Sequence, residues 1–183
     1  MKSFSVLKKQ IYSEGIYSIV PIRYEDRFAI MKWRNEQIFH LRQNKPLTIE
    51  AQERYFKNIV EPLFSEEKPS HILFSFLEGD ICIGYGGLVH INWIYKNAEI
   101  SFIMATELEN NSFQKYWMTY LKLIEQLAFE ELNLHKIYTY AFDLRPHLYF
   151  VLEQSGYRYE ARLTEHCFFE GKYFDVVIHS KRK

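Results

Sequence analysis

The sequence predicts an α+β fold in which helices flank a central sheet that is mixed but mostly antiparallel. Three β-rich runs follow one another between Ile72 and Met104, and short polar connections separate them, as in consecutive antiparallel strands. Gly79 supplies the residue that a tight hairpin needs in the first connection. Apolar residues at helical spacing lie before and after these strands. The predicted order is therefore strand, two helices, three strands, helix, strand, helix and two strands.

Size and composition favour one domain spanning residues 1–183. The chain has 183 residues, of which 48% are hydrophobic, which suits one well-formed core. The net charge is +0, so nucleic acid is not expected as the main partner. No run has transmembrane length and the N-terminus lacks an apolar signal region, so we expect a cytoplasmic protein without a membrane partner. Cys82 and Cys167 stand alone and the seven histidines show no ligand spacing, so no metal is expected.

The first third of the chain predicts a strand at 16–22 and two helices. Apolar residues at helical spacing in the first helix are Tyr24, Phe28, Met31 and Ile38. A cluster near the end of that helix consists of Trp33, Arg34 and Asn35. This cluster could contact an acceptor substrate, or it could cap and pack the helix. Thr48 is the expected N-cap of the second helix, which should stop before Pro62.

The strand that ends at Met104 carries an unusual carboxylate. Alternation places Glu99, Ser101 and Ile103 on one face of this strand. A carboxylate in an apolar strand must be paired, lie in a solvated cleft, or serve a function. A solvated edge-strand glutamate remains the alternative. Farther along, the patterns predict a helix over 116–132, a strand over 136–142, a helix from Pro146 to Gly156 and a final hairpin across Glu170-Gly171.

Four strings in this order resemble the GNAT family of acyl-CoA-dependent N-acyltransferases. They are A-E-I-S-F-I-M, L-A-F-E-E-L-N-L-H-K-I-Y-T-Y-A-F, V-L-E-Q-S-G-Y and E-G-K-Y-F-D-V-V-I-H-S. The resemblance covers about residues 16–180 and implies a central strand splayed from its neighbour. Within the family, W-R-N and A-F-E-E-L-N-L-H are most similar to nucleotide-amino-sugar acetyltransferases, and the last hairpin also resembles ribosomal-protein-alanine acetyltransferases.

The resemblance implies acetyl-CoA as co-substrate, with the pantetheine arm held by the backbone of Ser101, Phe102 and Ile103. In the family, a glycine-containing turn at the start of the next helix binds the pyrophosphate. The matching positions run from Ser112 to Trp117 and contain no glycine. Lys115 could contact the pyrophosphate as a point charge, with hydrogen bonds from Asn110, Asn111 and Ser112. Alternatively, the turn no longer binds a nucleotide and the chain is a GNAT-like binding module.

The predicted base is Glu99, and His90 on the preceding strand is the alternative base. Many family members place a tyrosine in the late helix to protonate the coenzyme A thiolate, but the matching position here is Leu152. Tyr149 could replace that tyrosine, or it could be a packed aromatic. Solvent could also protonate the thiolate, because a thiol has a pKa of only about 8.5.

Together, the motifs predict an N-acetyltransferase for a primary amine, in first place the amine of a nucleotide-linked amino sugar in surface-polysaccharide biosynthesis. By the same resemblance, Trp33 would stack on a sugar or base, Arg34 would lie near phosphate and Asn35 would bind a hydroxyl or amide. A protein N-terminus is the alternative acceptor. The expected partner is thus a small-molecule amine, and a homodimer stays open.

Overall fold

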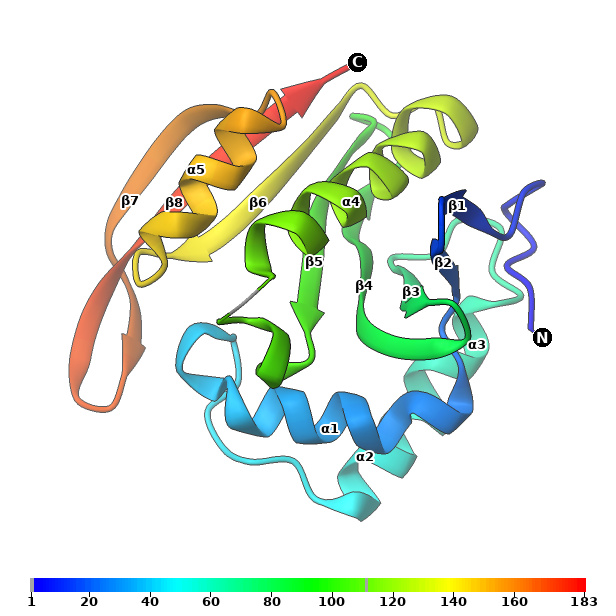
Figure 1. The fold of residues 1–183 in the computed structure, drawn as a ribbon, viewed down its shortest axis with the longest axis horizontal. Helices are drawn as coiled ribbons and strands as arrows, with labels where there is room; N and C mark the ends of the chain where they lie inside the picture. Colours follow the sequence, from blue (N-terminus) through cyan, green and yellow to red (C-terminus); the bar gives the residue numbers. More distant parts are fainter. Residues whose placement is uncertain (1, 111) are drawn as a thin grey trace.

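The computed structural model describes residues 2–110 and 112–183. Its strands form one sheet in the order β1-β2-β3-β4-β5-β6-β8-β7 (Figure 1). The strands are β1 (Tyr12–Glu14), β2 (Tyr17–Pro21), β3 (Ile72–Glu78), β4 (Ile81–Asn92), β5 (Asn97–Met104), β6 (Lys136–Phe142), β7 (Arg158–Phe169) and β8 (Lys172–Arg182). Neighbouring strands are antiparallel except β5 and β6, which are parallel. This sheet confirms the predicted fold class.

Helices flank the sheet on both faces. They are α1 (Arg27–Glu36), α2 (Ile49–Tyr55), α3 (Glu61–Leu63), α4 (Phe113–Glu125) and α5 (Pro146–Gln154), and α4 ends in a π-helical turn, η5 (Gln126–Glu131). Tyr120 of α4 stacks on Phe102 of β5, whereas Arg34 of α1 bonds to Tyr85 on the opposite face of β4. Thus α4 and α5 cover one face of the sheet, and α1 lies toward the other (Figure 1).

Local signals in the sequence account for most of these elements. Gly79 and Gly171 have φ angles of 58° and 79°, which confirms the two hairpin turns predicted at these positions. Thr48 accepts a hydrogen bond from the Ala51 amide over 3.2 Å and so caps α2 as expected. Gly156 ends α5 with a φ of 83°.

Three details differ from the sequence prediction. A short first strand, β1, pairs with β2, and its three residues were too few to show a periodic pattern. The second helix does not stop before Pro62, because a π turn over Phe56–Val60 runs directly into α3, which contains Pro62. In α1 the buried residues are Ile30 and Trp33, whereas Tyr24 and Phe28, two of the four apolar residues noted at helical spacing, are exposed.

Candidate active site

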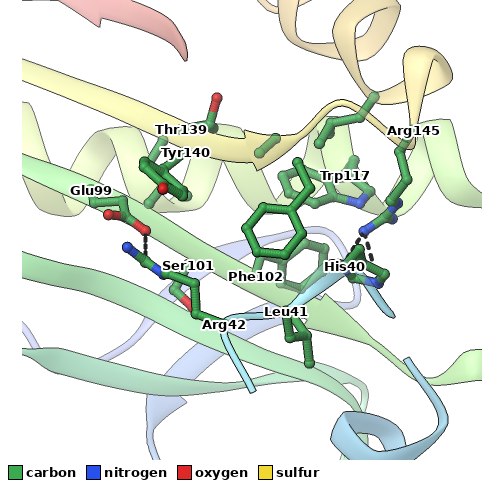
Figure 2. A pocket seen from close by; sticks show the side chains of 14 residues that line it. His40, Leu41, Arg42, Glu99, Ser101, Phe102, Trp117, Thr139, Tyr140 and Arg145 are labelled. Atoms are coloured by element: carbon green, nitrogen blue, oxygen red, sulfur yellow. Dashed lines mark hydrogen bonds and ion pairs between the residues drawn. The ribbon is translucent and has the colours of Figure 1, made fainter. Parts of the chain in front are cut away.

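The strands β5 and β6 separate after a short stretch of pairing. Their register ends with Glu99 opposite Tyr138, although both strands continue for several residues. A cavity of about 100 Å³ lies in the opening (Figure 2). Its lining comes from both faces of the sheet and from the segment after α1, and includes His40, Arg42, Glu99, Ser101, Phe102, Trp117, Tyr140 and Arg145. The splayed strand pair expected from the family resemblance is therefore present, and we call the opening the β5–β6 split.

Glu99 lies at the paired end of this split. It is 4% exposed, and its Oε1 accepts a hydrogen bond from Nη2 of Arg42. Nε2 of His90 lies 4.0 Å from the other carboxylate oxygen. Burial raises the pKa of Glu99 above its ordinary value, against the opposing effects of Arg42 and His90. A carboxylate in this environment suits a general base, so Glu99 is neither an edge residue nor fully solvated.

His90, the alternative base, lies beside this site rather than in it. A bulge interrupts the β4–β5 register between Val89 and Asn92, and His90 adopts a φ of 52° there. Its side chain is half-exposed and does not line the cavity in the split. The geometry therefore favours His90 as a neighbour of the Glu99 carboxylate rather than as the base.

Arg42 reaches Glu99 from the loop between α1 and α2. Its guanidinium lies 4.7 Å from the centre of the Tyr140 ring on β6, and its side chain is 47% exposed (Figure 2). The guanidinium occupies the position beside Glu99 that the ammonium of an acceptor would need. Because Arg42 is half-exposed, it can leave this position without a large desolvation penalty.

The β5 backbone corrects the predicted pantetheine contacts. The carbonyls of Ser101 and Ile103 would lie 2.0 and 2.8 Å from a Cβ added to Gly86 and Gly84, so both point toward β4. In an antiparallel strand, the N–H and C=O groups of successive residues point alternately to the two neighbouring strands. Those of Phe102 therefore point away from β4 and toward the split. Of the three predicted residues, Phe102 thus has its N–H and C=O groups on the open side, and the predicted roles of Ser101 and Ile103 do not fit this register.

A larger cavity of about 710 Å³ lies on the other side of Arg145, between the first turns of α4 and α5. Arg145 is 7% exposed and donates to Glu109 over 2.8 Å. It also donates to the His40 ring over 3.2 Å (Figure 2). Burial lowers the pKa of Arg145, and burial together with Arg145 lowers the pKa of His40 to about 3. Arg145 and His40 line both cavities, so this cluster separates the larger cavity from the split.

The predicted phosphate contacts are only partly placed at this larger cavity. Asn110 lines it, Ser112 is the residue before α4, and Asn111 lies outside the described residues. Lys115 instead lies over the rings of Tyr17 and Tyr116, at 5.1 and 5.4 Å, away from the cavity. Its predicted contact with pyrophosphate is not formed in this arrangement, because the side chain projects toward β2 rather than toward α5.

Tyr149 does not reach the split either. Its hydroxyl donates to Asp143 over 2.8 Å, and its ring stacks on His179 with centroids 5.2 Å apart. Burial and Asp143 raise the pKa of Tyr149. Its neighbour Leu148 lines the split instead. Tyr149 is thus a packed aromatic, which corrects its prediction as an acid for the thiolate.

The predicted acceptor cluster near the end of α1 also separates into different roles. Trp33 is 5% exposed and belongs to the core, so it cannot stack on a ligand. Asn35 bonds to both backbone groups of Leu47 and thereby holds the loop before α2. Only Arg34 faces a groove, where it bonds to Gln43 and the Tyr85 hydroxyl.

The residues around Arg145 fit acetyl-CoA. A cavity of 710 Å³ is within the size range of small-molecule sites, which is about 300 to 1,000 Å³. The peptide groups of Phe102 are open, and the buried Nε1 of Trp117, which lines the split, has no hydrogen-bond partner among the described residues. In residues 2–110 and 112–183, no histidine, cysteine and carboxylate side chains group in a way that could hold a metal ion. None of the helices described is long and apolar enough to cross a bilayer.

The sequence reasoning missed Arg42, His40, Tyr140 and Arg145. Arg42 and His40 lie in an irregular segment that offers no periodicity, and Arg42 meets Glu99 across 57 positions of the chain. Tyr140 alternates regularly in its strand and looked like any sheet aromatic. Arg145 precedes Pro146 at the start of the predicted late helix, and nothing in that position indicates that its side chain is buried.

Known proteins support the fold and the family. A family model described as "Acetyltransferase (GNAT) domain" matches residues 19–178. A spermidine N(1)-acetyltransferase of Vibrio cholerae is 34% identical over 94 residues, which cover 51% of this chain and 53% of that protein. The match thus spans about half the length of that curated relative.

Two solved structures of proteins from the same organism have the same fold. Spermidine N-acetyltransferase in complex with CoA and spermine superposes with a TM-score of 0.80 at 22% identity, over 92% of this chain and 96% of that one. A dodecameric structure in an intermediate state gives a TM-score of 0.75 at 24% identity, over 92% and 95%. These relatives act on spermidine by name, so the predicted subgroup of amino-sugar and ribosomal-protein-alanine enzymes is not supported. The family model spans most of the chain and confirms the predicted class of enzyme at the level of the family. The chain belongs to the GNAT acetyltransferase family.

Proposed function

We propose that this protein is an acetyl-CoA-dependent N-acetyltransferase that acts on a small primary amine. The observation that carries the proposal is the position of Glu99, a buried carboxylate with a raised pKa at the β5–β6 split. Beside it, the open N–H of Phe102 gives the same short segment a hydrogen-bond donor in addition to a base. This is the combination that acyl transfer to an amine requires.

Glu99 would act on the acceptor in two ways. Its carboxylate attracts the ammonium group to the split, in the position that the Arg42 guanidinium occupies. It then takes a proton, directly or through water, and leaves the amine with a free electron pair for attack on the acetyl carbonyl. Because its pKa is raised, the Glu99 carboxylate is a stronger base than an ordinary glutamate and is better suited to accept a proton near neutral pH.

Acetyl-CoA, when bound, supplies the acetyl group as an activated thioester. Toward it, the chain offers the open N–H of Phe102, which can donate to the acetyl oxygen as negative charge develops there. The N–H groups of the first turn of α4 would face the phosphates, and Arg145, whose charge is paired with Glu109, lines the same cavity. Leu152 and Tyr149 cannot protonate the leaving thiolate, because Leu152 is apolar and Tyr149 is engaged with Asp143. The thiolate therefore takes its proton from solvent.

The proposal leaves two classes of acceptor amine to compare. The relatives named above act on spermidine, whereas motifs in the sequence favour a nucleotide-linked amino sugar. Both are primary amines and both suit Glu99 as a base. Self-association is a further proposal, for which a dodecameric relative is the support.

Two measurements on the unmodified protein test the proposed function. Isothermal titration calorimetry should show binding of acetyl-CoA, and a thiol-release assay with a panel of primary amines should show turnover that needs both substrates. Mass spectrometry should find the acetyl group on the amine. A lack of acetyl-CoA binding at millimolar concentration would overturn the proposal and favour a GNAT-like binding module.

A further inference from the structure

A groove adjoins the split on the acceptor side. It has a volume of about 540 Å³ and lies between the loop before α2 and the β7–β8 hairpin. Leu41, Arg42 and Phe142 line both this groove and the split, so the two spaces are contiguous. We call it the acceptor groove. Its lining residues are Arg34, Leu41, Arg42, Gln43, Asn44, Lys45, Leu47, Phe142, Cys167, Phe168 and Phe169.

The charge of the acceptor groove has one sign. Its lining includes Arg34, Arg42 and Lys45 but no aspartate or glutamate. Among the described residues, Arg34 and Lys45 form no ion pair, and Arg42 is paired only with Glu99. Clefts lined by like charges focus the electrostatic field and select ligands of opposite charge.

Arg34 is held in position to contribute to this field. Its Nη1 donates to the Tyr85 hydroxyl over 2.6 Å and its Nε to Gln43 over 3.0 Å. Gln43 in turn donates to Asn35, which holds the loop through Leu47. The guanidinium is thus fixed by neutral partners, and its charge is not neutralised by a carboxylate.

A polyamine is a poor match for this groove. Spermidine carries several ammonium groups, and among the described residues Glu99 is the single carboxylate that lines the split and the groove. One ammonium could bind Glu99, but the others would face Arg34 and Lys45, and such repulsion between like charges opposes binding.

We propose that the acceptor is a primary amine that also carries an anionic group, a phosphate or a carboxylate, which binds in the acceptor groove. The amine would lie at Glu99 and the anion among Arg34, Lys45 and Arg42. This proposal rests on the proposed function and specifies its acceptor. It also gives Arg42 a second position, because an anion in the groove offers its guanidinium a new partner and leaves Glu99 free to accept the proton of the amine.

A matched series of amines tests the proposal. Ethanolamine, β-alanine and O-phosphoethanolamine share an aminoethyl group and carry a hydroxyl, a carboxylate and a phosphate, and spermidine is the polycationic comparison. At low salt, kcat/KM should be about tenfold or more higher for at least one anionic amine than for ethanolamine, as expected for a charge-assisted contact. The ranking of β-alanine against O-phosphoethanolamine distinguishes the two anions. Glucosamine and glucosamine 6-phosphate repeat the comparison on a larger scaffold.

Variants locate the effect in the groove. Lys45→Gln should lower kcat/KM for the preferred anionic amine about tenfold, mainly through KM, and so lower the ratio of that value to the value for ethanolamine. Lys68→Gln, an exposed lysine on the α3–β3 loop outside the groove, is the matched control and should change neither. Thermal stabilisation by the anionic amine alone should also be lost in Lys45→Gln, a readout that does not require turnover.

Equal kcat/KM values for ethanolamine and its two anionic analogues, and for glucosamine and glucosamine 6-phosphate, would overturn the anionic acceptor. Spermidine as the best acceptor would overturn it too. Either result would leave the acetyltransferase proposal intact. Absence of turnover with every amine would count against the proposed function instead. In that case the thermal shift still decides on the groove, because equal stabilisation of Lys45→Gln and the unmodified protein would contradict an anion site there.

Discussion

The two faces of β5 differ in the side chains that lie on them: charged, half-exposed groups on one face and packed aromatic rings on the other. On the face toward α1, Glu99 contacts a half-exposed arginine from a loop, and the adjoining groove also contains Arg34 and Lys45, which form no ion pair within residues 2–110 and 112–183. On the face toward α4, the Phe102 ring stacks on Tyr120 with centroids 3.8 Å apart. There the charged residue, Arg145, is buried and already paired with Glu109. Electrostatics can change on the first face when a ligand enters, whereas the second face is held by packing.

The difference teaches how one strand can serve two substrates. A movable charge such as Arg42 can exchange partners at small cost, because water solvates it in between. A buried pair such as Arg145–Glu109 is costly to break, because each charge would be left without a partner. The acceptor face is therefore suited to recognition and the coenzyme face to fixed positioning. The split between β5 and β6 is where the two faces meet.

The largest effect is expected from the acceptor face. Glu99→Gln keeps the shape and hydrogen bonding of the side chain but cannot take a proton from the amine. We expect kcat to fall by about 10² to 10⁴ near neutral pH, with little change in acetyl-CoA affinity. The rate of the unmodified protein should fall as the pH drops through the raised pKa of Glu99, and the variant should lack this limb and recover at high pH, where more acceptor is already neutral.

The matched control is Glu125→Gln, which removes a half-buried carboxylate paired with Lys181 outside the site. It should leave the pH–rate profile unchanged. Because burial raises the pKa of Glu99, its ionised form weakens folding as the pH rises, so Glu99→Gln should keep or raise the melting temperature at pH 7. An unchanged kcat in Glu99→Gln would contradict the role of base and shift attention to His90 or to water alone.

The contrast between the faces also explains what the sequence could predict. Hairpins at Gly79 and Gly171, the cap at Thr48 and the splayed strand were predictable, because each depends on local geometry or on an ordered set of motifs. The position of Glu99 was predictable because a charge in an apolar strand is rare. By contrast, Arg42 was not, because an irregular loop does not show which distant residue it contacts.

Some errors share one physical cause: periodicity shows spacing but not direction. Leu148 faces the split, and Tyr149 is the next residue in the helix. Its side chain therefore points in another direction, and its hydroxyl donates to Asp143. The peptide groups of Ser101 and Ile103 alternate with those of Phe102, so a shift of one residue exchanges open and paired groups. Trp33 looked like a ligand contact because its sequence neighbours are polar, yet it is buried in the core.

An intermediate effect is expected from the coenzyme face, where burial makes the protein sensitive to acid. The folded protein keeps His40 neutral down to a pKa of about 3, whereas the unfolded chain binds a proton near the ordinary value of 6.5. Stability should therefore be lost as the pH falls below about 6.5, by about 2 kcal/mol at pH 5 from this residue alone. His40→Gln keeps an acceptor for Arg145 but does not titrate, so its free energy of unfolding should fall less between pH 7 and pH 5.

Urea unfolding at both pH values measures this difference. His135→Gln is the matched control, because that histidine is exposed and its side chain has no hydrogen-bond partner among the described residues. If the free energy of unfolding changed equally with pH in His40→Gln and in the unmodified protein, His40 would not be held neutral beside Arg145. The contrast between the two faces would then weaken.

The smallest effect should come from Tyr149→Phe, which separates packing from catalysis on the coenzyme face. The substitution removes only the hydroxyl that donates to Asp143, and Asp143 retains its ion pair with Arg162. The stacked contact between the ring and His179 should survive. We expect a loss of about 1 kcal/mol in the free energy of unfolding, the typical value of one hydrogen bond, and kcat within about twofold of the unmodified protein. The pH–rate profile should stay the same, because the tyrosine does not reach the split. A drop in kcat of tenfold or more, with a new dependence on pH above 8, would instead make Tyr149 the acid for the thiolate, and it would require α5 to turn when acetyl-CoA binds.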